Sequence, residues 1–155
     1  MSSRPRLILL GVACLLAAAL PAGCGGGGGS SGPLTQEELV AKGNEICRDQ
    51  IQRFAEIQAD PPANAADGVD QTNALIDASR DELSAFEDLQ PPEELQARLD
   101  RYLDARRIAI RQLEAGHDAA KRQDREAYGA ALTRALKQTP ERRRLARALG
   151  FTRCT

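Results

Sequence analysis

The residues of this 155-residue chain that could do chemistry are few and scattered. His117 is the only histidine, which excludes a histidine-rich metal site, and the adjacent acids Asp81 and Glu82 are of a kind common on helix surfaces. The sequence contains no glycine-rich phosphate loop, serine nucleophile motif or metal-spaced cluster of histidines and carboxylates. We therefore expect no catalytic residue, no cofactor and no metal ion.

Arg106 is the most unusual of the remaining polar residues. It falls within the apolar stripe of a predicted helix, between Tyr102 and Ala109. A buried arginine needs a carboxylate or several carbonyl groups around it. Two interpretations stay open: the stem lies along the bundle with the charged head in water, or the guanidinium faces a ligand in a polar pocket. His117 is expected on the same stripe as a packed or partly exposed side chain.

Residues 1–23 have the layout of a secretory signal peptide. Two arginines precede an uncharged apolar run over residues 7–20, which is shorter than the roughly 20 apolar residues that a membrane-spanning helix needs. Small residues then lead to Cys24. The arrangement resembles bacterial lipoprotein precursors, although Pro21 stands where that family usually has leucine. The alternative is an ordinary signal peptide cut near Ala19.

The resemblance implies that Cys24 is diacylated and becomes the mature N-terminus. The protein would then be extracytoplasmic and anchored to the cell membrane by this lipid. Residues 24–33 form the lipidated end and a Gly/Ser tether, and residues 34–155 form one helical domain. Eight tether residues span roughly 15 Å on average, which places the domain close to the membrane.

The same reading accounts for all four cysteines. Cleavage removes Cys14 and acylation consumes Cys24, so that Cys47 and Cys154 remain as a pair. Two such cysteines usually form a disulfide in an oxidising compartment. Closing a loop of about 100 residues contributes roughly 4 to 5 kcal/mol in the chain-entropy model. The alternative, a redox-active dithiol, would be expected to show a close Cys-x-x-Cys spacing or a basic, exposed setting.

Apolar periodicity over residues 34–155 predicts an all-α antiparallel four-helix bundle. The first helix begins at a capping box formed by Thr35 and Glu38. The second and third helices are expected over about 70–89 and 92–122, and Asp124 is a plausible cap for the fourth. The inward residues predicted for the fourth helix are Tyr128, Ala131, Leu132, Ala135 and Leu136.

Pro140 is expected to bend or break the fourth helix, because proline removes a hydrogen bond and disfavours helix at the preceding residue. An unbroken helix could carry its end past Cys47, whereas bridged cysteines need Cα atoms about 4.4 to 6.8 Å apart. We therefore predict a bend or break near Pro140 and a tail that turns back after Gly150, with Phe151 packed inward.

Charge is unevenly distributed along the chain. Residues 67–90 contain seven acids and one base, whereas residues 134–155 contain seven bases and one acid. One interpretation is complementarity within the bundle. The other is that the basic segment, through Arg142, Arg143 and Arg144, contacts anionic lipid or an envelope polymer. Nucleic acid is not an expected partner, because the domain is acidic overall, poor in aromatic residues and predicted to be exported.

The two ends of the domain also resemble the small secreted helical proteins of high-GC bacteria. Those proteins match an early Ile-Cys-Arg segment, here residues 46–48, with a late Leu-Gly-Phe segment followed by cysteine, here residues 149–154. The resemblance implies a disulfide-closed helical bundle, and it does not imply any activity.

Together these features predict a membrane-anchored lipoprotein that acts as a non-enzymatic binding or interaction module. Two alternatives stay open: a small-ligand-binding bundle with a polar pocket near Arg106, or a module whose basic C-terminal segment contacts lipid, an envelope polymer or an envelope protein.

The leader generates the first testable prediction. Metabolic labelling with a fatty-acid analogue should mark the protein, and Cys24→Ala should abolish the label because it removes the acylated thiol. An alanine variant that still carries the label would contradict lipidation at Cys24.

Overall fold

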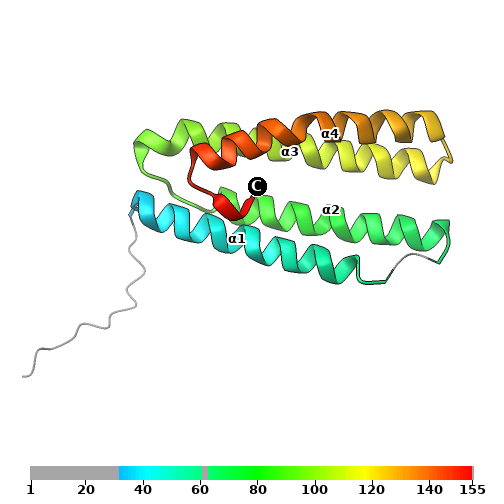
Figure 1. The fold of residues 1–155 in the computed structure, drawn as a ribbon, viewed down its shortest axis with the longest axis horizontal. Helices are drawn as coiled ribbons and strands as arrows, with labels where there is room; N and C mark the ends of the chain where they lie inside the picture. The colour runs from blue at the N-terminus through cyan, green and yellow to red at the C-terminus, as the bar shows by residue number, and fades with distance from the viewer. Residues whose placement is uncertain (1–31, 61–62, 155) are drawn as a thin grey trace, which may run out of the picture.

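The computed structural model describes residues 32–60 and 63–154, and these form an antiparallel four-helix bundle (Figure 1). The helices are α1 (Gln36–Ile57), α2 (Ala65–Glu87), α3 (Glu93–Lys121) and α4 (Arg125–Ala148), followed by a short 3₁₀ helix, η1 (Thr152–Cys154). The described part of the chain contains no strand. The predicted all-α bundle is therefore confirmed, whereas the predicted signal peptide and Cys24 lie outside the described residues.

The predicted capping box fixes the start of α1. The Thr35 hydroxyl oxygen accepts a hydrogen bond from the Glu38 backbone N–H at 3.2 Å, and the Glu38 carboxylate accepts one from the Thr35 N–H at 2.8 Å. Just before this box, the Leu34 N–H donates to the Gln90 carbonyl at 2.7 Å. These bonds attach the beginning of the domain to the connection between α2 and α3.

Three aromatic rings form the centre of the core. Phe86 of α2, Tyr102 of α3 and Phe151 of the tail are almost completely buried, and their ring centroids lie 5.3 to 5.8 Å apart. Gly43 of α1 faces this cluster, and a Cβ atom at that position would overlap the Phe151 ring. The absence of a side chain at Gly43 therefore allows the tail to pack directly against α1.

The tail reverses direction immediately after α4, as predicted. Gly150 has a φ of 83°, which favours glycine, and the Phe151 N–H donates to the Ala146 carbonyl at 2.9 Å. The Asn44 side chain then accepts a hydrogen bond from the Arg153 N–H at 2.8 Å. These contacts hold η1 against α1.

The reversal allows the predicted disulfide between Cys47 and Cys154 to form. The two Cα atoms lie 5.2 Å apart, inside the usual range for bridged cysteines. Phe151 packs inward as expected.

Of the predicted bend or break at Pro140, the break is wrong, because α4 continues through this residue as one helix. Proline deprives the Leu136 carbonyl of its helical partner. Both residues lie on the solvent-exposed side of α4, where water can satisfy that carbonyl and the cost of the missing bond is reduced. The turn after Gly150 brings Cys154 back to Cys47.

The predicted burial of one stripe of α4 is wrong for three of its five residues. Ala131 is buried, whereas Tyr128, Leu132 and Leu136 are exposed. The helices pack in sequence, α1 on α2, α2 on α3 and α3 on α4, and the main connection between α1 and the α4 end of the chain runs through η1. Figure 1 shows the α1–α2 and α3–α4 hairpins side by side. Within ranges 32–60 and 63–154, no helix covers the outer part of the α4 stripe.

The close approach of Phe151 to Gly43 generates a stability prediction. Gly43→Ala should lower the free energy of unfolding by about 1 to 3 kcal/mol, measured by urea denaturation, because the added methyl group overpacks the core. Gly129→Ala is the matched control, since nothing lies within 4 Å of its added Cβ, and alanine favours a helix interior by up to about 1 kcal/mol. A Gly43→Ala variant as stable as the wild type would contradict the described packing.

Candidate functional site

Two adjoining cavities lie between α1 and α4, with volumes of about 280 and 360 Å³. We call the first the apolar cavity and the second the polar cavity, and both together the α1–α4 groove. Phe54, Arg106, Thr139 and Arg142 line both cavities. The two spaces therefore adjoin one another, and their volumes lie near the lower limit of the range for small-molecule sites, about 300 to 1,000 Å³.

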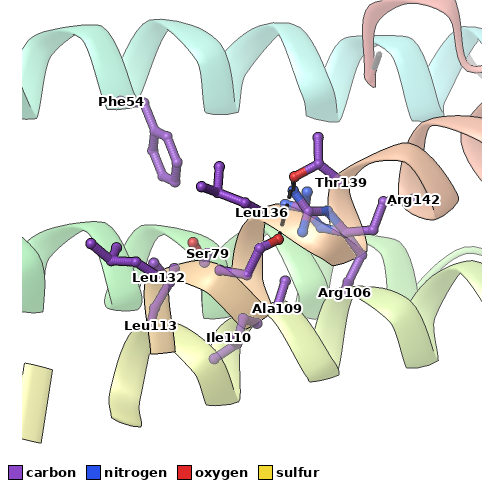
Figure 2. Close-up of a pocket in the computed structure, with 11 residues that line it drawn as sticks. Phe54, Ser79, Arg106, Ala109, Ile110, Leu113, Leu132, Leu136, Thr139 and Arg142 are labelled. Carbon is purple, nitrogen blue, oxygen red and sulfur yellow. Dashed lines mark hydrogen bonds between the residues drawn. The ribbon is translucent and has the colours of Figure 1, made fainter. Parts of the chain in front are cut away.

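The apolar cavity owes its lining to the part of α4 that the bundle leaves uncovered. Figure 2 shows Phe54 pointing from α1 toward Leu136 of α4, with Ile110 and Leu113 of α3 below. The Leu136 side chain is 72% exposed, and that of Leu132 is 44% exposed. This end of the groove is an open apolar surface between two helices.

An ion pair between Arg106 of α3 and Glu82 of α2 lies where the two cavities meet. The side chain of Arg106 is only 19% exposed and that of Glu82 only 3% exposed. Burial lowers the pKa of Arg106 to about 10, and the nearby charge of Arg142 acts in the same direction. Arg106 thus stays protonated at neutral pH, and Glu82 neutralises it. The sequence left two interpretations of Arg106 open, and the one that places its charged head in water is wrong.

Arg142 of α4 is the second guanidinium at this junction (Figure 2). It donates a 3.4 Å hydrogen bond to the Thr139 hydroxyl. Burial lowers the pKa of Arg142, and the charge of Arg143 contributes to the same shift. Burial also raises the pKa of the neighbouring Tyr102, so that this phenol stays neutral and offers Arg142 no counter-charge at neutral pH.

Two further arginines, Arg143 and Arg153, line the polar cavity beside Arg142. Among the residues that the structure describes, no carboxylate forms an ion pair with any of these three arginines. Because Glu82 already compensates Arg106, the polar cavity carries a positive charge that no carboxylate of the described residues pairs. The arrangement can bind an anion through charge-assisted hydrogen bonds.

The structure brings together three of the four arginines that the sequence singled out. Arg106, Arg142 and Arg143 line the groove, whereas Arg144 is exposed and bonded to Glu141 through two nitrogens, at 2.6 and 2.8 Å. Cys47 and Cys154 border the polar cavity as a disulfide.

Sequence reasoning missed Glu82 as the partner of Arg106. The signal was present, because residue 82 follows Ser79 and precedes Phe86 at the three- and four-residue spacing of an inward helix face. A buried arginine on the next helix required a carboxylate on such a face.

The acidic segment does not neutralise the basic C-terminal segment. Its ion pairs with other helices reach α1 and α3: Arg53 with Asp81, Arg80 with Glu114, and Arg107 with Glu87, each at 2.6 Å. Charge complementarity therefore exists within the bundle, but among the described residues it supplies no ion-paired carboxylate to Arg142, Arg143 or Arg153.

His117 takes no part in the groove. It is buried in α3, with its Nδ1 atom 3.3 Å from the Asp118 carboxylate. The described ranges 32–60 and 63–154 contain no group of three or more histidine, cysteine or acidic side chains that could hold a metal ion. None of the helices in these ranges has both the length and the apolar character needed to cross a bilayer.

Comparisons with known proteins add no assignment: the chain matches no family model, no curated protein and no solved structure.

The buried ion pair generates a prediction of its own. Glu82→Gln should lower the free energy of unfolding by about 3 to 5 kcal/mol, because it leaves the Arg106 guanidinium buried without a counter-charge. Asp81→Asn is the adjacent control and should cost about 1 kcal/mol or less, since its pair with Arg53 is exposed. Equal effects of the two substitutions in urea denaturation would refute the role assigned to Glu82.

Proposed function

We propose that this protein is a membrane-anchored extracytoplasmic lipoprotein whose helical domain is a non-enzymatic module that binds a small organic anion in the α1–α4 groove. The observation that carries the proposal is the group of Arg142, Arg143 and Arg153 around one cavity, with no ion-paired carboxylate among the described residues.

The half-buried setting of Arg142 strengthens its interaction with an anion. A charge removed from water interacts more strongly with an opposite charge than an exposed one does. Arginine also presents several donors in a planar fork, which matches carboxylate and phosphate groups. A bound anion would supply the counter-charge that the bundle itself does not provide.

The other polar groups of the groove favour binding over catalysis. The Ser79 and Thr139 hydroxyls donate to the Leu75 and Ala135 carbonyls of their own helices, at 2.8 and 3.4 Å. The Glu82 carboxylate is engaged by Arg106. An activated nucleophile needs an adjacent general base, and none of these hydroxyls has one within hydrogen-bond reach.

The proposed location at the cell membrane is supported by the N-terminal sequence. After cleavage of a signal peptide over residues 1–23, a lipid on Cys24 and a short tether would hold the domain at the outer face of the cell membrane. The alternative role of the basic segment as a lipid or polymer contact is less well supported, because Glu141 already compensates Arg144.

A fluorescent organic anion tests the proposal directly. The full chain carrying Cys24→Ala, purified without reductant, should bind anilinonaphthalene sulfonate with increased fluorescence. The double substitution of Arg142 and Arg143 by glutamine should weaken binding at least tenfold, about 1.4 kcal/mol, because it removes two of the three uncompensated charges.

Arg144→Gln is the control, since it removes the same charge from a residue outside the groove. It should leave the dissociation constant within about twofold of the wild-type value. Wild-type protein that does not bind the probe, or an equal loss in both variants, would overturn anion binding in the groove.

A further inference from the structure

We infer that the ligand of the α1–α4 groove is a single-chain anionic amphiphile, bound as a monomer. Its carboxylate or phosphate head would lie among Arg142, Arg143 and Arg153, and its alkyl chain between Phe54 and Leu136. This inference rests on the proposed function, since it specifies the class of anion bound at that site.

The first argument is the order of side chains along α4. The groove-lining residues change from Arg142 through Thr139 to Leu136 and Leu132 at helical spacing, so that they lie on one face. Ten residues of helix cover about 15 Å. One face of α4 therefore passes from a cationic end to an apolar end along the two adjoining cavities, as an amphiphile requires.

The second argument is where the bundle exposes its apolar side chains. Ile51, Tyr128, Leu132 and Leu136 are the large exposed hydrophobic residues of the described chain, and all except Tyr128 line the groove. Scattered exposed hydrophobic residues need no explanation, but such a concentration indicates a binding surface. An alkyl chain lying there would remove these side chains from water.

The third argument is charge. Arg106 and Glu82 neutralise one another, whereas Arg142, Arg143 and Arg153 have no described acidic partner. An anionic head gains from this charge, and a cationic head of the same chain length is repelled by it. An electrically neutral chain would leave the charge uncompensated.

A chain-length series separates this inference from the proposed function. The full-length Cys24→Ala protein is loaded with anilinonaphthalene sulfonate, which is then displaced by acetate, octanoate or dodecanoate below micelle-forming concentrations. Each buried methylene should raise affinity about threefold or more, so that dodecanoate binds at least tenfold more tightly than octanoate. Dodecyltrimethylammonium should displace the probe at least tenfold less effectively than dodecanoate.

Two variants test where the alkyl chain of the ligand lies. Leu136→Gln should reduce dodecanoate affinity at least fivefold and leave acetate competition unchanged, because Leu136 lines only the apolar cavity. Its side chain is 72% exposed, so the substitution should not impair folding. Tyr128→Gln, a change at an exposed apolar residue outside the groove, should leave the affinity for both anions within about twofold of wild type.

If the probe binds but its displacement does not depend on the chain length of the competitor, the amphiphile proposal is overturned and the anion site is retained. No probe binding at all would overturn both. Pelleting of the protein with phosphatidylglycerol vesicles, without displacement of the probe by dodecanoate, would replace the monomeric ligand with contact to a membrane surface.

Discussion

The attachment of the C-terminal tail to α1 is the constraint on which the rest of the structure depends. The Cys47–Cys154 disulfide, Phe151 against Gly43 and the Asn44 contact to Arg153 all act within two turns of α1. In the chain-entropy model a loop of this length is worth roughly 4 to 5 kcal/mol. Because the chain closes through its tail, the middle of α4 is not drawn onto α1, and the groove stays open between them.

Closure by the tail also explains why the groove is polar at one end and apolar at the other. The reversal after Gly150 places Arg153 and the disulfide beside Arg142 and Arg143. Farther from the tail, α4 contributes leucines that no other described helix covers. The ion pair of Arg106 and Glu82 lies at the junction and adds no net charge. The binding chemistry that we propose thus follows from how the bundle is closed.

Local signals allowed much of this fold to be predicted from the sequence. The Thr35 capping box, the Asp124 cap and the Gly150 stop depend on neighbouring residues, and each occurs as expected. The predictions that were wrong or incomplete depend on contacts between residues far apart in the sequence. Apolar periodicity placed Leu132 and Leu136 on one face of the fourth helix, but it does not show whether another helix covers that face. Proline chemistry predicted a break, but its cost depends on whether the freed carbonyl faces water. Arg106 was identified as unusual, although its partner required knowing which helix lies opposite.

The distribution of contacts along the chain has a consequence for the order of folding. Each helix packs mainly on its neighbour in sequence, so the relative contact order of the three helix pairs is low, and such contacts form quickly. The tail joins residues separated by 107 to 111 positions, among the longest separations in the chain. We therefore expect the tail to dock late, after the hairpins have formed, so that the disulfide closes a bundle that is already assembled. The polar cavity, which includes Arg153 and Cys154, is complete only after that final step.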